Sequence, residues 1–189
     1  MTGVVTGEDG VARCPWAGSA PEYLLYHDTE WGRPLRGDDA LYERMSLEAF
    51  QSGLSWLTVL RKREAFRLAF HGFVIDEVAR FGPDDVARLL ADAGIVRNRA
   101  KIDAAINNAQ AALELDGGLS ALLWSYAPPP RRRPKTTAEI PSTTPGSVAM
   151  AKDLKRRGFR FVGPTTAYAL MQSTGMVDDH LAGCERHPI

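Results

Sequence analysis

Apolar residues recur at the spacing of an amphipathic helix through much of the chain. In the stretch that begins at Asp38, the residues that share one helical face are Leu41, Met45 and Phe50. Asp38 or Asp39 can cap the start of this helix, and Gly53 follows near its end. A second helix is predicted from near Ser55, and its large apolar residues include Trp56, Leu60 and Phe70.

The second half of the chain repeats this pattern. Pro83 suits the first position of a helix that runs through about Asp92, because that position needs no backbone N–H donor. A longer helix is predicted from roughly Asn98 to Leu115, where Ile102, Ile106 and Ala109 are helically spaced. The last two helices are predicted at about Gly146 to Arg157 and Pro164 to Ser173. No β-type alternation of useful length occurs, so the predicted fold class is all-α.

Two segments interrupt the helical pattern. Residues 1–12 are predicted to be a flexible N-terminal extension before a single domain at 13–189, whose start (CPWAGSAPEYLLYHDTEWGRP) indicates turns around a short helix. The stretch APPPRRRPKTTAEIPSTTP at 127–145 predicts an exposed crossing between two lobes. Its PPPRRRPK run is interpreted as a solvated linker, with phosphate contact as the alternative.

Composition narrows the class of protein. A length of 189 residues with 44% hydrophobic residues fits one compact domain or two small lobes with a shared core. The first ten residues lack the features of a signal peptide, and no apolar run could span a bilayer, so we expect a cytoplasmic protein with no membrane partner. Lys plus Arg and Asp plus Glu number 23 each, which argues against non-specific coating of nucleic acid but permits a local basic footprint. No heptad run is present, and a monomer is therefore expected.

The segment RGFRFVGPTTAYALMQ predicts a tight connection between the last two helices. Gly158 can end the first helix, and Gly163 can let a partner approach the backbone closely. The first turn of the following helix, with Pro164 and Thr165, offers unpaired N–H groups and a positive dipole end to a phosphate oxygen. An ordinary helical hairpin would also contain these glycines, so both interpretations remain open.

Cysteine and histidine suggest a metal site. The chain has two cysteines, and Cys14 and His27 lie near one end while His180 and Cys184 lie near the other. Two thiolates and two imidazoles suit a tetrahedral Zn²⁺, and four protein ligands indicate a structural ion. Two buried thiols with two ordinary histidines are the alternative. The competing ligands are His71, which can cap a helix end, and His187, near the C-terminus.

Longer motifs carry a resemblance to a known family. They are the Cys14-x-Trp16 pair, the Tyr26-His27-Asp28 to Trp31-Gly32 run, LEAFQSGLSW at 47–56, AGIVRNRAKI at 93–102, RGFRFVG at 157–163 and VDDH-x-x-x-C at 177–184. From Arg13 to Cys184 the chain closely resembles the 3-methyladenine DNA glycosylase I family, of the helix-hairpin-helix DNA glycosylase superfamily. The resemblance implies a hairpin motif at about 146–175 and one structural zinc, held by Cys14, His27, His180 and Cys184, that joins the two ends of the chain.

The resemblance also implies an aromatic pocket for a flipped base. The residues that match its lining are Trp16, Tyr26, Glu48 and Trp56, with Tyr23 as a neighbour. A base methylated at N3 is electron-poor, so stacking and cation–π attraction favour it over unmodified adenine. Trp56 is the expected stacking platform, and Glu48 the acceptor for the exocyclic amine. Without the resemblance, the aromatic residues would be interpreted as part of the hydrophobic core, and Glu48 as an exposed residue on a helix. The residues expected to contact DNA are Gly53, Leu54, Gly163, Thr165 and Thr166.

The expected reaction is hydrolysis of the N-glycosidic bond of 3-methyladenine in alkylated double-stranded DNA, as part of base excision repair. Thr165 stands where bifunctional relatives carry lysine, so no Schiff-base lyase step is implied. Glu48 and Asp178 are the candidate catalytic residues. Asp178 either assists the sugar or water, or fixes the loop beside the zinc ligands.

Three other functions are compatible with parts of the sequence. A non-catalytic, zinc-stabilised DNA-binding module would keep His180, Cys184 and Gly163 without needing Glu48 beside Trp56. A glycosylase for another alkylated purine, such as 3-methylguanine, would need only a small change in pocket shape. A cysteine-dependent hydrolase is disfavoured because a metal-bound Cys14 would not be a free nucleophile.

Overall fold

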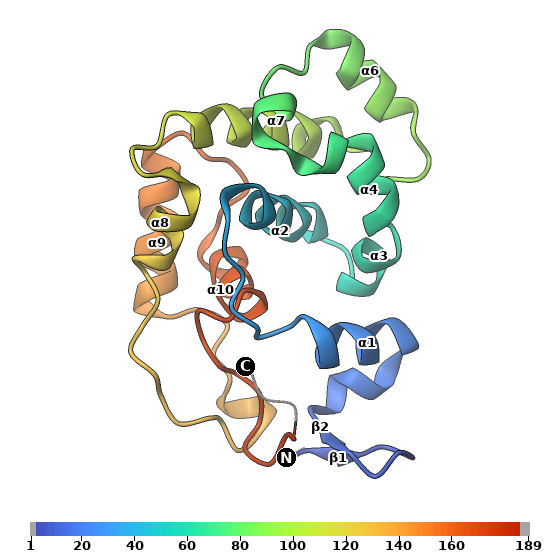
Figure 1. Ribbon diagram of the computed structural model, residues 1–189, viewed down its shortest axis with the longest axis vertical. Helices are drawn as coiled ribbons and strands as arrows, with labels where there is room; N and C mark the ends of the chain where they lie inside the picture. The colour runs from blue at the N-terminus through green and yellow to red at the C-terminus, as the bar shows by residue number, and fades with distance from the viewer. Residues whose placement is uncertain (1–2, 186–189) are drawn as a thin grey trace.

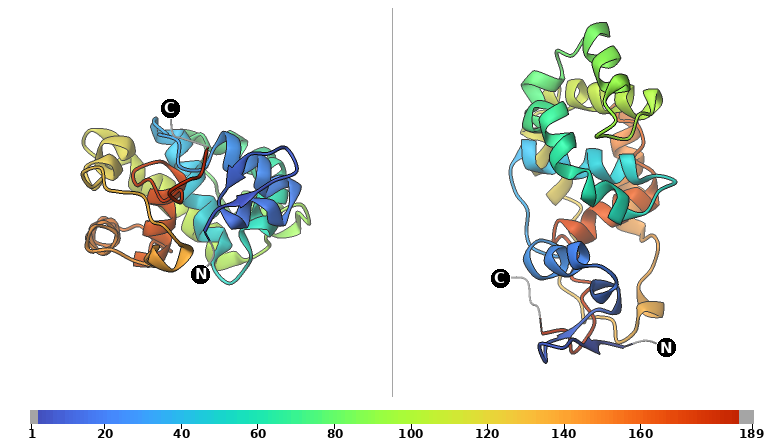
Figure 2. Two further views of the ribbon diagram at one scale, coloured as in Figure 1. Left: turned by 90° about the horizontal axis from the view of Figure 1, so that it is seen from below. Right: turned by 90° about the vertical axis from the view of Figure 1, so that its right-hand side faces the viewer.

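The computed structural model describes residues 3–185. Figures 1 and 2 show an elongated molecule with helices α6 and α7 at one end and the strands β1 and β2 at the other. The elements of the N-terminal part are β1 (Val5–Thr6), β2 (Ala12–Arg13), the 3-10 helix η1 (Pro15–Ser19) and α1 (Pro21–Thr29). Among residues 3–185, no helix is both long enough and apolar enough to cross a bilayer.

Ten α-helices form most of the described chain, which agrees with the helix-rich prediction. Those of the central part are α2 (Asp38–Gln51), α3 (Trp56–Arg61), α4 (Arg63–Ala69), α5 (Ile75–Val78), α6 (Pro83–Ala91), α7 (Arg99–Leu113) and α8 (Gly118–Trp124). Two helices, α9 (Pro145–Arg156) and α10 (Pro164–Ser173), follow the crossing segment. Short 3-10 helices lie at η2 (His71–Phe73) and η3 (Thr137–Glu139).

The predicted helices near 38–53, 83–92, 98–115, 146–157 and 164–173 are confirmed as α2, α6, α7, α9 and α10. The single helix predicted from near Ser55 to Phe70 is wrong, because it breaks between α3 and α4 at Lys62. The Lys62 ammonium donates to the carbonyl oxygens of Ala93 and Gly94 at 3.0 and 3.1 Å. These bonds anchor the junction to a neighbouring loop.

A two-stranded antiparallel hairpin departs from the all-helical prediction. It pairs Val5 with Arg13 and Thr6 with Ala12, and so occupies much of the segment predicted to be a flexible extension. Strands of two residues are too short to leave an alternating pattern in the sequence. Arg13 holds the hairpin through ion pairs with Asp9 at 2.6 Å and Asp28 at 2.9 Å. The hairpin is therefore stabilised by the ion pairs of Arg13, although its sequence shows no strand pattern.

The core is centred on α2, which lies in the middle of the molecule (Figure 1). Its fully buried side chains include Leu41, Tyr42, Leu47 and Phe50. Phe50 packs on Phe66 with ring centroids 4.6 Å apart. Burial of these side chains contributes roughly 1.5–3 kcal/mol each to the hydrophobic stabilisation. This core fixes α2 and thereby the polar residue Glu48, which lies on the same helix.

The connection between α9 and α10 is supported by α7. Asn107 donates to the carbonyl oxygen of Gly158 at 2.7 Å. Asn108 binds both backbone groups of Arg160, donating to its oxygen at 3.0 Å and accepting from its N–H at 2.7 Å. Phe161, at φ 55°, adopts a left-handed conformation that is strained for a bulky residue. The connection is thus held in one shape by side chains from a distant helix.

Candidate functional site

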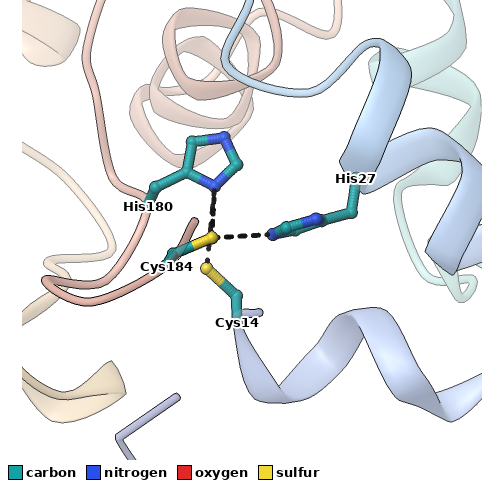
Figure 3. A group of neighbouring side chains, drawn as sticks. All are labelled: Cys14, His27, His180 and Cys184. Carbon is teal, nitrogen blue, oxygen red and sulfur yellow. Dashed lines mark hydrogen bonds between the residues drawn. The ribbon is translucent and has the colours of Figure 1, made fainter. Parts of the chain in front are cut away.

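Four side chains from opposite ends of the chain converge at one buried point. Cys14 directly precedes η1 and His27 lies in the last turn of α1, while His180 and Cys184 lie in the loop after α10. Figure 3 shows their sulfur and ring-nitrogen atoms turned toward one another. The ligand atoms all lie within 4.8 Å of one another, and all four residues are buried. The structure therefore brings together the residues that the sequence paired as metal ligands.

The spacing of these atoms fits a tetrahedral metal ion. The Cys184 Sγ lies 3.5 Å from both His27 Nε2 and His180 Nδ1, and the Cys14 Sγ lies 3.8 Å from His180 Nδ1. Metal–sulfur bonds of about 2.3 Å and metal–nitrogen bonds of about 2.0 Å in a tetrahedron separate the sulfur and nitrogen atoms by about 3.5 Å. The cluster can therefore hold a four-coordinate ion with little rearrangement.

The other nitrogen of each histidine ring meets an acceptor. His27 Nδ1 lies 2.9 Å from Asp28 Oδ1, and His180 Nε2 lies 3.2 Å from the carbonyl oxygen of Trp31. Protons on these two nitrogens leave lone pairs on His27 Nε2 and His180 Nδ1, which face the cluster. Gly32 has φ 75°, and a Cβ there would lie 2.8 Å from His180 Nε2, so a larger residue would be strained and would displace this ring.

The Cys14 thiol is unsuited to act as a free nucleophile. The neighbouring Cys184, followed by burial, raises the pKa of the Cys14 thiol far above its usual range. Both thiols could lose their protons in this buried site only beside a cation. A bound metal ion would supply that positive charge. The competing ligand His71 lies on the surface and pairs with Glu77 at 3.0 Å, and His187 lies outside the described residues.

A cavity of about 330 Å³ lies next to this cluster. The five residues that the sequence assigned to a base pocket, namely Trp16, Tyr23, Tyr26, Glu48 and Trp56, all line it. Its other lining residues, which the sequence analysis missed, are Trp31, Gln51, Ile140, Ala169 and Gln172. Four of these had a signal, because Trp31 and Gln51 lie in quoted motifs, and Ala169 and Gln172 follow Thr165 at helical spacing.

Aromatic rings form one wall of the cavity. The centroids of Tyr26 and Trp56 are 5.6 Å apart at an angle of 47°, and Trp16 meets Tyr23 edge-on at 5.7 Å. The Tyr23 hydroxyl accepts the N–H of Leu57 at 2.9 Å, which ties α1 to the first turn of α3. The buried indole N–H of Trp56 has no hydrogen-bond partner among residues 3–185. A buried donor without a partner at a cavity is typical of a ligand site.

Glu48 is the buried acid of the cavity. Its residue is 6% exposed, and burial raises the pKa of its carboxyl to about 7, although Arg44 and Ser173 oppose the rise. Arg44 donates to the Tyr26 hydroxyl oxygen at 2.8 Å, which leaves the phenolic proton for another acceptor. Burial also raises the pKa of Tyr26, which keeps the phenol neutral. The cavity thus combines stacking rings, a desolvated acid and a neutral hydroxyl donor.

The cavity and the metal cluster share their aromatic residues. The Trp16 ring lies 5.1 Å from that of His27, and the Trp31 ring lies 4.7 Å from that of His180. Trp16 also follows Cys14 by two residues. An ion held by the four ligands would therefore fix one wall of the cavity without contacting its contents.

A second hollow of about 370 Å³ shares Glu48, Gln51 and Ala169 with the first. It brings together Gly53, Leu54, Thr165 and Thr166, all of which the sequence assigned to DNA contact. Leu54 is 41% exposed at its edge. Gly163 caps the start of α10, and a Cβ there would meet nothing within 4 Å, which leaves the backbone open to a partner.

The loop that carries Leu54 is held by a buried lysine. Lys101 donates to the carbonyl oxygen of Phe50 at 2.8 Å and also to that of Ser52. Gly53 follows at φ 80°, a conformation that favours glycine. The exposed leucine is therefore presented on a backbone with a fixed shape.

Asp178 does not line either hollow. Arg133 donates to its Oδ2 at 2.6 Å, and its Oδ1 accepts the N–H of His180 at 3.2 Å. This geometry favours the second alternative for Asp178, in which it fixes the loop of the metal ligands. Arg131 likewise pairs with Asp179, so two of the three arginines in PPPRRRPK bind the protein itself.

Known proteins of one family are similar to this chain over most of its length. A family model described as methyladenine glycosylase matches residues 16–187. The DNA-3-methyladenine glycosylase 1 of Escherichia coli (strain K12) is 45% identical, over 93% of this chain and 97% of its own length. The corresponding enzyme of Haemophilus influenzae is 42% identical, over 91% of this chain and 96% of its own length.

Solved structures give the same result. A crystal structure of 3-methyladenine DNA glycosylase I superposes with a TM-score of 0.89 at 44% identity, covering 93% of this chain and all of that chain. A variant of 3-methyladenine DNA glycosylase I in complex with 3-methyladenine also has a TM-score of 0.89, at 35% identity, covering 94% of this chain and 98% of its own. The resemblance stated from the sequence is confirmed, and the chain belongs to the methyladenine glycosylase family.

Proposed function

We propose that this protein removes 3-methyladenine from alkylated DNA by hydrolysing its N-glycosidic bond. The observation that carries this function is the desolvated carboxyl of Glu48 inside an aromatic cavity that shares this residue with the hollow at Leu54. A non-catalytic DNA-binding module has no need for a buried acid that lines such a cavity. The activities named for the relatives, together with their coverage of nearly the whole chain, support the same reaction.

Binding would begin at the segment that contains α9 and α10, which we assign as a helix-hairpin-helix motif. The start of α10, with Thr165 and Thr166, offers N–H groups and a positive dipole end to a DNA phosphate. Leu54 would then enter the space left by the extruded nucleotide. We expect duplex DNA to be bound by a monomer in the cytoplasm.

The cavity would select the methylated base by the positive charge of the base and by the hydrogen-bonding groups on its edge. Stacking on Trp56 gains more from an electron-poor base than from normal adenine. The Glu48 carboxylate would accept a hydrogen bond from the exocyclic amine and offset the positive charge on the base. Because a cationic base is already a good leaving group, positioning and charge complementarity can supply much of the acceleration. Thr165 provides no amine, so the reaction is monofunctional.

For the metal cluster we propose a structural Zn²⁺ that joins the two ends of the described chain. Two thiolates and two imidazoles are a donor set that zinc prefers, and four protein ligands leave no position for a reactive water. Bound zinc would supply fold stability at the wall of the cavity and would take no part in base removal.

The test is release of free bases from methylated duplex DNA, separated by chromatography. We expect release of 3-methyladenine with little 7-methylguanine, and greatly slowed release by Glu48→Gln at unchanged zinc content. Folded, metal-loaded wild-type protein that releases no base would refute the proposal in favour of the DNA-binding module. Preferential release of 3-methylguanine would instead assign the other alkylated purine.

A further inference from the structure

Gln172 contributes a polar group to the cavity whose orientation is set from outside it. This residue lies near the end of α10, and its side-chain Nε2 donates to Asp179 Oδ2 at 2.9 Å. Asp179 is 1% exposed and lies in the loop directly before His180. The carbonyl oxygen is therefore the polar atom of the Gln172 amide that Asp179 does not bind.

Three side chains hold the Asp179 carboxylate. The Tyr168 hydroxyl donates to Oδ2 at 2.6 Å, and Arg131 donates to Oδ1. Tyr168 and Gln172 are four residues apart on α10 and so lie on the same face of the helix. Because a carboxylate only accepts hydrogen bonds, Gln172 must turn its NH₂ group toward Asp179. Its carbonyl oxygen, Oε1, is then the atom available to a bound molecule.

We propose that Gln172 is a specificity-determining residue that presents its carbonyl oxygen to the bound base, with Asp179 and Arg131 as the positioning residues that fix this orientation. The proposal deepens the proposed function, on which it rests. A fixed acceptor beside Glu48 matches a base edge with an exocyclic amine, as in 3-methyladenine. The same oxygen would oppose the O6 carbonyl of 3-methylguanine, leaving two acceptors without a donor between them.

The substitution Asp179→Asn tests the orientation directly. Since Arg131 donates to the Oδ1 side, the asparagine oxygen would take that side and its NH₂ group would face Gln172. The Gln172 amide would then flip and present NH₂ to the cavity. We expect the ratio of single-turnover rates for 3-methyladenine over 3-methylguanine, measured on the same methylated DNA, to fall about tenfold.

A matched control is Asp153→Asn. Asp153 is also buried, at 6% exposed, and also binds a tyrosine and arginines, namely Tyr126, Arg156 and Arg157. It does not line the cavity, so its loss would lower stability while leaving the ratio of the two rates unchanged. An unchanged ratio in Asp179→Asn, with both variants folded, would overturn the proposal.

Gln172→Leu covers the case in which Asp179→Asn fails to fold. It leaves the bonds of Asp179 to Tyr168 and Arg131 in place, and removes the acceptor together with the Nε2 donor to Asp179. We expect it to slow 3-methyladenine release about tenfold and to change 3-methylguanine release less than twofold. Equal effects on both bases, or no effect on either, would refute a role in discrimination.

Calorimetric titration of the free bases separates this proposal from the proposed function. If the wild-type protein releases neither base from DNA, the catalytic function fails, yet the affinity ratio for free 3-methyladenine over 3-methylguanine still measures the role of Gln172. A smaller affinity ratio in Gln172→Leu than in the wild type supports that role, and an equal ratio overturns it.

Discussion

The metal cluster and the neighbouring cavity are built in opposite ways. The cluster joins residues that are up to 170 positions apart, such as Cys14 and Cys184, and each of its four side chains is at most 2% exposed. Seven of the ten residues that line the cavity lie within residues 16–31 and 48–56, and the cavity shares lining residues with the second hollow at Leu54. The cluster is thus buried within the fold, whereas the cavity adjoins a hollow with an exposed edge.

This difference predicts which measurable property each site controls. If the cluster holds the proposed zinc, loss of a ligand would remove a cross-link between distant segments, so it should lower stability first and activity only as a consequence. Loss of a cavity residue removes contacts to a bound base, so it should lower activity with little change in fold. Trp16 and Trp31 lie between the two sites and should show both effects.

The largest effect is expected for Cys184→Ala. Removal of this ligand should abolish stoichiometric metal binding and lower the free energy of unfolding by at least about 3 kcal/mol. For a chain of this size, the loss corresponds to a fall in Tm of roughly 10 °C. Metal analysis and calorimetry measure both quantities. His71→Ala is the control, because His71 is exposed and lies outside the cluster; retention of one metal ion by Cys184→Ala would contradict the assignment.

The next largest effect is expected for Trp56→Ala. Stacking of a base on an aromatic side chain contributes about 1–3 kcal/mol, so single-turnover excision should fall roughly tenfold to a hundredfold. Metal content and Tm should change little, because Trp56 does not contact the cluster. Trp56→Phe, which keeps a stacking ring, should recover most of the rate. Equal loss in both variants would show that indole shape, and not stacking, matters.

A pH dependence is expected from Glu48. Because burial raises the pKa of its carboxyl from 4.5 to about 7, the folded state holds the proton more tightly than the unfolded state. Stability from this group is therefore present below about pH 4.5, and falls by up to about 3 kcal/mol as the pH rises to 7. The excision rate should rise over the same range, since the ionised form binds the cationic base. Glu48→Gln should flatten both profiles; a pH-dependent stability difference of opposite sign would exclude this cause.

The smallest effect is expected for Lys101→Met. This change removes the two hydrogen bonds that hold the end of α2 and the Leu54 loop, so excision should slow about threefold to tenfold while binding of the free base stays unchanged. Two measurements separate these effects: calorimetric titration with the free base gives its affinity, and single-turnover assays on duplex DNA give the excision rate. Weaker binding of free 3-methyladenine would place Lys101 with the cavity instead of the loop.

Local sequence determined the five confirmed helices, because apolar periodicity and capping residues act within a few turns. Pro83, Asn98 and Thr144 each stand beside or at the start of a helix that the structure confirms. The sequence also determined the family, since long motifs in a fixed order are highly specific. The hairpin of β1 and β2 left no such signal, because it depends on Arg13 and the distant Asp28.

Only the tertiary structure decided the relations between distant side chains. Sequence motifs identified Glu48 as a candidate, but its raised pKa arises from burial on a helix packed in the core. Helical spacing could place Gln172 at the cavity, but its orientation is set by Asp179 in the loop after α10, which is held in turn by Arg131. Local propensity acts over a few residues, whereas desolvation and hydrogen-bond orientation depend on groups that folding brings together.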